Sequence, residues 1–476
     1  MILSISWKNI WRNKVRSLIL IGTITFALTG TIFMIALMEG MIRDHDKKVI
    51  ETQLSHIQIH NPSFSENMRL ADSISNSAEV INKLQKYNFI KAFSTRLETN
   101  GMVSSSYASR GALIIGIDPE KEKNVIKVYK YLDSTSKFLD QVKRQNSIVI
   151  GKKMAKDLQM VNYQITEKSI EHLKEIGIPD AIIHKLATIK DKKFHTTVKF
   201  YNTLEKILSQ NEFDTYADLI ADNCMKYKIG RKIILRMQDI NGNIVEEAFR
   251  IVGVFNTNND LFDGFYVFVK KDYLTQLLGL PQGTINQIVI LTDSRKKVET
   301  YTAGLKKAFP HLQVESMYDL DPTIKLMSKM IWIYYAIFEA FILFALSFGI
   351  VNTMLMAVME RTKELGMLMA VGMNRKRVFA MIMNESVLLT ATGGLLGIIF
   401  GYLLTMLTSH TGIDFSKFVQ QGFEGLGYSA LIYPQISPLL LIETALLVVA
   451  TGILAAIYPA IKAIKLKPAQ ALRIDV

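Results

Sequence analysis

The chain has little of several residue types and motifs that mark particular protein classes. Its 476 residues include one cysteine, Cys224, so no internal disulfide can form and a disulfide-stapled fold is excluded. Ten prolines and 27 glycines are too few for a collagen-like or disordered chain. The phosphate-binding pattern Gly-x-x-x-x-Gly-Lys-Ser/Thr is absent, since Gly151-Lys152 lacks both the earlier glycine and the following hydroxyl. We therefore expect no nucleotide site on this chain.

Chemistry-bearing side chains also lack a recognisable arrangement. The eight histidines and the single cysteine are scattered, without the spacing of a catalytic or zinc site. We therefore expect no catalytic, cofactor-binding or metal-binding residues.

Four long apolar stretches lie towards the two ends of the chain, at residues 17–39, 330–359, 378–408 and 438–461. From Ser17 to Met38 there is no charged residue. At about 1.5 Å per residue this stretch extends ~33 Å, enough for a hydrocarbon core of about 30 Å. A cleavable signal peptide is the competing interpretation, but the apolar part is longer than a signal core and no small-x-small cleavage site follows. The sequence therefore predicts four transmembrane helices.

Basic residues concentrate in three short segments beside these stretches. The segments are residues 1–16, 360–377 and 462–476, and they hold most of the net charge of +13. Short basic segments stay on the cytoplasmic side of a membrane. We therefore expect both termini in the cytoplasm of a multi-pass inner-membrane protein, with residues 40–329 and 409–437 on the periplasmic side. Charges placed at membrane boundaries also argue against a nucleic-acid partner.

The long segment 40–329 has the composition of a folded domain. Strand patterns occupy residues 55–60, 91–106, 111–117 and 147–150, then return at 232–237, 248–255, 265–269 and 287–292. Asn241-Gly242 between two of them is typical of a hairpin turn. From about residue 166 to 227 strand signals are missing and helical spacing replaces them. The predicted fold class is thus four transmembrane α-helices with a large α+β extracytoplasmic domain between the first and second helices, interrupted by a helical insertion.

The predicted division of the chain follows from these patterns. It comprises an amphipathic cytoplasmic segment 1–16, helix 17–39, the extracytoplasmic domain 40–329 with its insertion at about 166–227, helix 330–359, a cytoplasmic loop 360–377, helix 378–408, an outer loop 409–437, helix 438–461 and a cytoplasmic tail 462–476.

Two motifs beside the membrane resemble a known family. The run from Met359 to Met373, followed by Arg375 to Val378 and Glu385, resembles the cytoplasmic signature of FtsX/MacB-type ABC transporter permeases. The end of the fourth apolar stretch, Tyr458-Pro459-Ala460, together with the segment from Lys467 to Arg473, resembles the same family. Within that family a large outer domain looks most like the lipoprotein-releasing LolC/LolE permeases. The segment 252–255, with Asp263, Tyr266 and Val267, is similar to their MacB-like outer domain.

The resemblance implies a function and a set of partners. The chain would be a permease subunit that extracts lipoproteins from the inner membrane for transfer to the outer membrane. A separate cytoplasmic ABC ATPase dimer would bind ATP and Mg²⁺ and hydrolyse the ATP, since no cofactor is expected on this chain. The further partners would be a second permease copy or a related permease, the lipoprotein cargo with a periplasmic acceptor, and membrane lipids. A split MacB-like exporter and an FtsX-like mechanotransmitter that controls an external cell-wall hydrolase are the alternatives.

Three groups of residues are candidates for these tasks. Glu360, Lys363 and Glu364 have helical i, i+3, i+4 spacing, so a short helix in the cytoplasmic loop could dock on the ATPase, whereas a plain solvated turn is the other interpretation. The expected ATPase-coupling residues are Glu360, Arg361, Lys363, Glu364, Leu365, Gly366, Met367, Leu368, Ala370 and Gly372. The expected acyl-chain contacts in a lipid-facing cavity, which could equally be an ordinary lipid-facing stripe, are Met34, Leu37, Met38, Met41, Ile333, Ile337 and Phe341.

The third group is a set of small residues in the third span. Gly393, Gly397 and Gly401 recur at every fourth position and predict a smooth face on which another helix packs. Ionisable residues also occur inside the spans, at Glu339, Glu385 and Glu443. They could form an ion path, or could hydrogen-bond within the helix bundle.

Overall fold

The structure is a computed structural model that describes residues 7, 10–415, 428 and 431–465. The chain divides into two compact units. We call residues 1–44, 323–419 and 429–476 the helical unit, and residues 45–322 and 420–428 the sheet unit. The predicted motif from Lys467 to Arg473 lies outside the described residues, as do parts of the predicted segments 1–16, 409–437 and 462–476.

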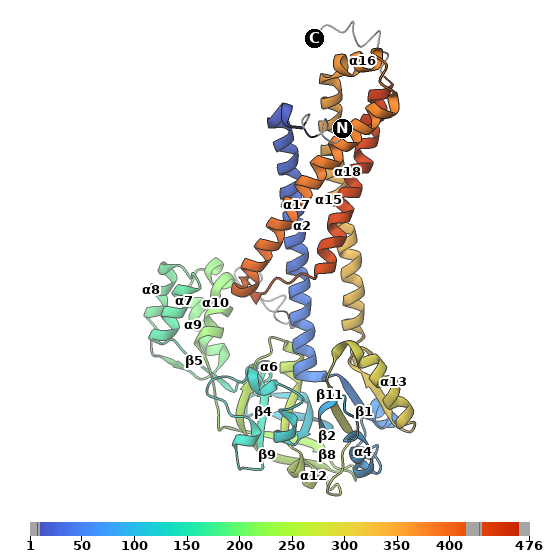
Figure 1. The fold of residues 1–476 in the computed structure, drawn as a ribbon. Coiled ribbons are helices and arrows are strands. Elements are labelled where there is room, and N and C mark those ends of the chain that lie inside the picture. The colour runs from blue at the N-terminus through green and yellow to red at the C-terminus, as the bar shows by residue number, and fades with distance from the viewer. Residues whose placement is uncertain (1–6, 8–9, 416–427, 429–430, 466–476) are drawn as a thin grey trace. The chain divides into compact units, whose positions relative to one another are not determined.

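Four long helices make up most of the helical unit (Figure 1). They are α2 (Lys14–Val49), α15 (Pro322–Glu360), α17 (Arg375–Thr411) and α18 (Pro438–Ile464). Each contains a segment long and apolar enough to cross a membrane, judged by length and composition. Shorter elements of this unit are η1 (Trp11–Asn13), α16 (Thr362–Ala370), β13 (Ile413–Asp414) and β14 (Leu431–Ile432).

The helices extend beyond the apolar stretches that predict them. The predicted first span ends at residue 39, but α2 continues to Val49 through a polar sequence, and α15 begins at Pro322 although its apolar stretch begins near residue 330. Hydropathy marks the part of a helix suited to lipid, whereas the helix itself ends where its backbone hydrogen bonds end.

The predicted glycine face of α17 packs on α2. A Cβ atom added at Gly393, Gly397 or Gly401 would lie 2.9, 2.7 or 2.9 Å from the nearest side-chain atom of α2. The α2 side chains that meet the three glycines are, in order, Ile24, Leu28 and Ile32. The helices are close enough for interhelical hydrogen bonds, in which the Thr25 and Thr29 hydroxyls donate to the carbonyl oxygens of Gly393 and Gly397 at 3.2 and 3.3 Å. Small residues permit this close approach.

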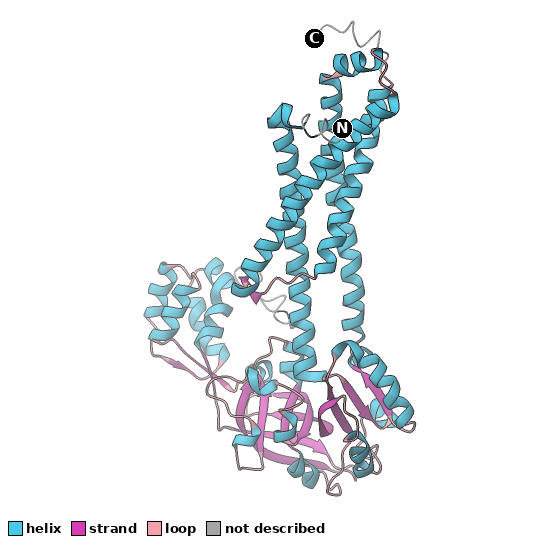
Figure 2. Ribbon diagram, viewed as in Figure 1, coloured by secondary structure: helices cyan, strands magenta, loops and turns pink. Residues whose placement is uncertain are grey.

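A nine-stranded mixed sheet forms the main part of the sheet unit (Figure 2). Its strands are β1 (Ile57–His60), β2 (Ile90–Ser104), β3 (Ser109–Ile117), β4 (Ser147–Gly151), β8 (Lys232–Gln238), β9 (Ile244–Phe255), β10 (Tyr266–Lys270), β11 (Gln287–Thr292) and β12 (Gln313–Ser316). The order is β12-β1-β11-β2-β3-β10-β4-β9-β8, and β8 also pairs with β2. The pairs β3–β10 and β4–β9 are parallel and the other pairs are antiparallel.

Short helices accompany this sheet. They are α3 (Pro62–Asn67), α4 (Ser77–Leu84), α5 (Pro119–Glu122), α6 (Lys152–Asp157), α11 (Asp260–Phe265), α12 (Lys271–Leu277), α13 (Val298–Ala308) and α14 (Met317–Leu320). The single-turn helices are η2 (Ile50–Leu54), η3 (Val128–Tyr131), η4 (Leu139–Gln141) and η5 (Arg295–Lys297). The predicted hairpin joins β8 to β9, and Gly242 in its turn has φ of 85°, which glycine adopts without steric cost.

The insertion contains strands as well as helices. Its helices are α7 (Glu167–Glu175), α8 (Asp180–Ala187), α9 (Thr197–Ile207) and α10 (Gln210–Cys224). A three-stranded sheet accompanies them, with β5 (Val161–Gln164) between β6 (Lys193–Phe194) and β7 (Met225–Tyr227). The expectation that strands are missing from residues 166–227 is therefore wrong. Strands of two or three residues are too short to show the alternation that identifies a strand.

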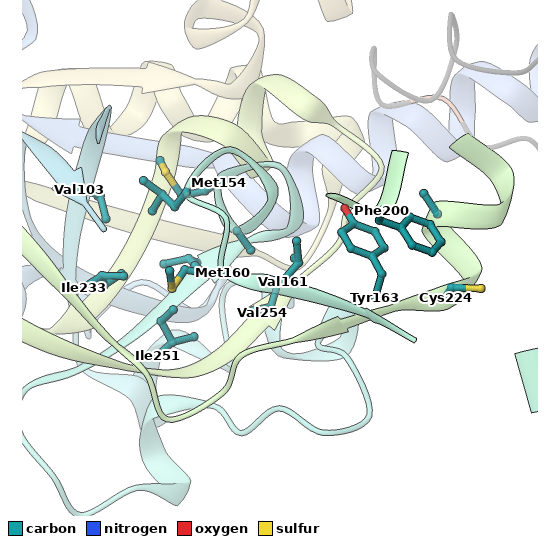
Figure 3. Packing of buried hydrophobic residues seen from close by; sticks show 14 of the residues in the cluster. Val103, Met154, Met160, Val161, Tyr163, Phe200, Cys224, Ile233, Ile251 and Val254 are labelled. Carbon is teal, nitrogen blue, oxygen red and sulfur yellow. The ribbon is translucent and has the colours of Figure 1, made fainter. Parts of the chain in front are cut away.

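One hydrophobic core runs from the main sheet into the insertion. Val103, Ile233 and Ile251 come from the sheet, and Tyr163 and Phe200 come from the insertion (Figure 3). The Tyr163 and Phe200 rings stack with centroids 4.6 Å apart and planes 7° apart. The insertion is therefore joined to the sheet by shared packing. The structure confirms the predicted fold class of four membrane-length helices with a large α+β domain between the first and the second.

Candidate functional site

The candidate site is the short helix α16, which joins α15 to α17. Arg361, between α15 and α16, has φ of −100° and ψ of 18°, so the two helices are separate. The Thr362 hydroxyl donates to the carbonyl oxygen of Met359 at 2.7 Å and covers part of the exposed end of α15. At the far end Gly372 has φ of +102°, a conformation that suits glycine and ends the helix. The side chain of Asn374 then accepts from the Lys376 amide at 3.0 Å and caps α17.

A buried ion pair fixes the start of α16 to α17. Nη1 of Arg361 donates to both carboxylate oxygens of Glu385, at 3.1 and 3.2 Å. The two side chains are only 10% and 7% exposed. Glu385 is therefore hydrogen-bonded within the helix bundle, which is one of the two interpretations open from its sequence. An ion pair this buried is costly to break, because the remaining charge has no water to solvate it.

Two further ion pairs connect the loop to the start of the chain. Arg16 of α2 donates to Glu360 at 2.7 Å, and Arg12 of η1 pairs with Glu364 of α16. The Arg12 guanidinium holds the pKa of the Glu364 carboxyl below its usual range, so Glu364 is ionised at neutral pH. Both side chains of the Arg12–Glu364 pair are well exposed, which limits its contribution to stability. The three pairs together connect the end of α15, the turn at Arg361 and α16 to the N-terminal helices and to α17.

The exposed face of α16 carries mostly small and apolar residues. Lys363, Met367, Ala370 and Val371 are exposed, with Met367 at 54% and Val371 at 84%. Their spacing of four, three and one residues places them on one side of the helix. Arg375, Lys376 and Arg377 follow at the exposed start of α17. This surface therefore combines the exposed apolar side chains of Met367, Ala370 and Val371 with three adjacent positive charges.

The predicted coupling residues differ in their exposure. Arg361, Leu365 and Gly366 are buried and cannot contact a partner directly. Glu360 and Glu364 already hold arginines of this chain. Lys363, Met367, Ala370 and Gly372 are exposed, Glu360 is exposed although it is paired with Arg16, and Leu368 is half-buried. Val371 is not among the predicted coupling residues, although it lies within the motif and helical spacing places it eight residues after Lys363 on the same face.

The predicted acyl-chain residues lie on α2 and α15. Met34, Ile333, Ile337 and Phe341 have exposed side chains, and the other three residues are half-buried. Met38 packs with Ile42 against the cluster of Ile35, Tyr335 and Leu440. A small cavity of about 10 Å³ between α2, α15 and α18 is lined by other residues, among them Thr31, Glu339 and Thr444. The structure therefore does not gather the seven predicted residues around this cavity.

The intramembrane glutamates have three different surroundings. Glu385 is paired with Arg361, Glu339 lies at the small cavity beside Thr444, and Glu443 is exposed on α18. The ion pair with Arg361 accounts for Glu385 without an ion path.

Comparison with known proteins finds a family similar to the C-terminal part of the chain. Residues 336–468 match the family model described as FtsX-like permease C-terminal. These residues, which we call the FtsX-like domain, are similar to that family and contain α16, the Arg361–Glu385 pair and the three glycines of α17. The expected resemblance to FtsX/MacB-type permeases is confirmed, and the narrower resemblance to LolC/LolE stays a prediction.

Curated relatives of the chain include two kinds of ABC protein. A macrolide export ATP-binding/permease protein MacB of Bdellovibrio bacteriovorus is 33% identical over 164 residues, which are 34% of this chain and 22% of the relative. An uncharacterized ABC transporter permease, YvrN of Bacillus subtilis, is 25% identical over 248 residues, or 48% of this chain and 55% of the relative. The matches therefore span less than two thirds of the relatives' own lengths.

Two solved structures are also similar to parts of the chain. The extracellular domain of the transporter YknZ from Gram-positive bacteria matches with a TM-score of 0.28 and 13% identity, over 55% of this chain and 98% of that domain. The periplasmic region of MacB from Actinobacillus actinomycetemcomitans matches with a TM-score of 0.30 and 12% identity, over 58% of this chain and 95% of that region.

Proposed function

We propose that the chain is the permease subunit of an ABC transporter, and that α16 is the element on which a cytoplasmic ATPase acts. The observation that carries the proposal is the position of α16 within the FtsX-like domain. The turn just before it is fixed by the buried Arg361–Glu385 pair, and its exposed side carries Met367, with Val371 directly after the helix. A short helix held this way presents apolar side chains to a partner and is anchored firmly enough to pass on a force.

The ion pairs suggest how movement would spread from α16. A push on α16 acts directly on α17, because Arg361 and Glu385 are buried and bonded through two contacts. The Arg12–Glu364 pair is exposed and can be remade at little cost. Movement of α16 would therefore carry α17 with it, together with α2, which packs on the glycine face of α17.

The nucleotide would be bound outside these 476 residues. The phosphate-binding pattern is missing from the sequence, whereas the name of the MacB relatives states that they are ATP-binding/permease proteins. We therefore place ATP, Mg²⁺ and the chemistry of hydrolysis on an ABC ATPase partner. Two permease chains, identical or related, would sit on a pair of ATPases.

For the cargo we propose a lipid-anchored protein that is extracted from the outer leaflet and passed to an acceptor. Support comes from the exposed apolar side chains of Met34 on α2 and of Ile333, Ile337 and Phe341 on α15, which could hold an acyl chain. A second candidate is export of a small amphiphile, which the macrolide export named for the MacB relatives favours.

Co-purification tests whether α16 holds the ATPase. The full chain is purified gently from native membranes as wild type, as Val371→Glu and as Val198→Glu, and the bound ATPase is quantified. Val198 is a matched control, since it is an exposed valine at 62% on α9. We expect Val371→Glu to retain at most a tenth of the wild-type ATPase and Val198→Glu to retain all of it. Equal recovery from both variants would contradict docking on α16.

The same preparation separates the two cargo candidates. Mass spectrometry before and after addition of ATP should find an acylated protein that leaves the complex when ATP is added. Recovery of the ATPase with an adaptor and no acylated protein would move the function to export of a small amphiphile.

A further inference from the structure

A large basic groove lies in the sheet unit where the insertion joins the main sheet. It has a volume of about 1230 Å³. Its walls come from the turn between β2 and β3, the loop at residues 133–135, strand β7 with the segment that follows it, and Arg250 of β9. The volume exceeds the roughly 300–1,000 Å³ that is typical of small-molecule pockets. A chain-like ligand therefore fits this groove better than a single small anion does.

The charge of the groove is strongly positive. Its basic residues are Lys226, Lys228, Arg231, Lys232 and Arg250, and they face one lining carboxylate, that of Asp133. Lys226, Arg231 and Lys232 are exposed.

The side chain of Arg250 is only partly satisfied. Its Nη1 donates to the carbonyl oxygen of Gly230 at 2.8 Å, but its buried Nε finds no acceptor among the described residues. Burial lowers the pKa of Lys228, and the charge of Arg231 lowers it further. A group of like charges held this close favours a ligand that brings negative charge.

Strand β7 adds a second recognition element along the groove. It is the last strand of its sheet, in the order β6-β5-β7. The Lys228 amide donates to the Met160 carbonyl at 2.9 Å, and in the antiparallel register Lys226 lies opposite Asn162. Alternate residues of an antiparallel strand bond to the same neighbour, so Met225 and Tyr227 direct their backbone groups away from β5. An extended peptide could pair with that edge.

The walls of the groove are held in place by the core beneath them. Met160 and Val161 belong to the hydrophobic cluster that continues from the sheet to the insertion (Figure 3). The Lys228 ammonium donates to the carbonyl oxygens of Gln159 and His195, both at 2.8 Å, and lies 5.5 Å from the centre of the exposed Tyr107 ring. The groove is therefore formed without its ligand, which reduces the entropy cost of binding.

We propose that this groove binds an extended acidic peptide segment of a partner protein, which adds to β7 as a further strand. Backbone hydrogen bonds to Met225 and Tyr227 would supply affinity, and the five basic side chains would select acidic residues. The inference concerns the sheet unit alone and does not depend on the proposed transport function.

Fluorescence anisotropy tests the proposal on the full chain in nanodiscs of zwitterionic lipid. The probe is a fluorescein-labelled seven-residue peptide in which glutamate and valine alternate. We expect the triple variant K226E/R231E/K232E to weaken binding at least tenfold. The control variant K296E/K297E/K307E reverses three exposed lysines elsewhere in the same unit and should bind as the wild type does. If charge reversal impairs folding, the milder variant K226Q/K232Q should still weaken binding several-fold.

Two further binding measurements, with an N-methylated peptide and with anionic lipid vesicles, test the nature of the ligand. The same peptide with N-methyl groups on alternate residues has lost the donors that a strand needs, and we expect it to bind at least tenfold more weakly. Equal binding of both peptides would overturn strand addition to β7. Equal binding by the groove variant and its control would overturn the site itself. Binding of anionic lipid vesicles through these residues, with no binding of the peptide, would identify a membrane surface as the ligand and overturn the proposal.

Discussion

Arg361 and Glu385 form a buried ion pair between the turn that precedes α16 and the body of α17, with Nη1 3.1 Å from Oε1. The pair explains two features of the sequence together. A carboxylate inside an apolar helix is costly, and an arginine in a loop proposed to dock a partner would be expected at the surface. Their contact satisfies both charges and fixes the one loop on which the proposed coupling depends.

Neutralising one partner of this pair should destabilise the protein strongly. Glu385→Gln and Arg361→Gln each leave a buried charge unpaired, which typically costs about 3–5 kcal/mol. The double variant removes both charges and should lose less stability than the sum of the single variants. Thermal midpoints of the full chain in detergent measure this. Single variants that unfold at the wild-type temperature, or effects that simply add, would contradict a coupled pair.

Substitution of the glycine face should weaken the packing of α17 on α2. Gly397→Ala places a methyl group 2.7 Å from Leu28 and should destabilise by about 1–3 kcal/mol, as overpacking does. Gly394→Ala is the control, because its added Cβ would lie 3.9 Å from Val448, an ordinary contact. We expect the control to be neutral or slightly stabilising, since alanine favours helix. If the contact is responsible, the double variant Gly397→Ala with Leu28→Ala should lose less stability than the sum of the two single variants.

The stability of the sheet unit should depend on pH through Asp263. Burial raises the pKa of this carboxyl to about 7, although hydrogen bonds from Thr257 oppose the shift. An acid whose pKa is raised by folding binds more protons in the folded state. Stability is therefore greatest below the unfolded pKa near 4 and falls as the pH rises towards 7.

The variant Asp263→Asn tests this dependence. The stability of this variant should change less than that of the wild type between pH 4 and 7. Above pH 7 the variant should be the more stable of the two. The urea midpoint can be followed by a brief thiol-labelling pulse at Cys224, the single cysteine, which is buried in the same unit. Every sample is brought to the same pH for the pulse, because labelling needs the thiolate. Parallel profiles for the two proteins would show that Asp263 is not the titrating group.

Charged substitutions should test the placement of the cargo. We expect Leu37→Lys and Ile337→Lys to abolish capture of acylated cargo while the ATPase still co-purifies, because an ammonium group buried beside an acyl chain loses its solvation. Leu454→Lys is the matched control on α18, where the side chain is 66% exposed. Normal cargo capture by the two test variants would remove α2 and α15 from the proposed cargo path.

Features that depend on residues close together in the sequence could be predicted. The spacing of Gly393, Gly397 and Gly401 indicated a packing face, and apolar runs located the four long helices. Spacing within one helix is fixed by helix geometry alone, so it needs no knowledge of the rest of the fold.

Contacts between distant residues could not be predicted in this way. Arg12 and Glu364 are 352 residues apart, and Arg16 and Glu360 are 344 apart. The motif around α16 therefore indicated a coupling loop without showing that Glu360, Arg361 and Glu364 bond inside the chain. The basic groove likewise combines residues near positions 107, 133, 226 and 250, which only the folded sheet brings together.

Site-specific crosslinking tests the central claim most directly. With Cys224 replaced by serine, a single cysteine is placed at Val371, or at Val198 as the control, and carries a thiol-reactive photocrosslinker in native membranes. The account predicts an adduct between Val371→Cys and an ABC ATPase, identified by mass spectrometry, and no such adduct from Val198→Cys. Absence of the adduct at Val371, in membranes where the ATPase co-purifies with the chain, would contradict α16 as the coupling element.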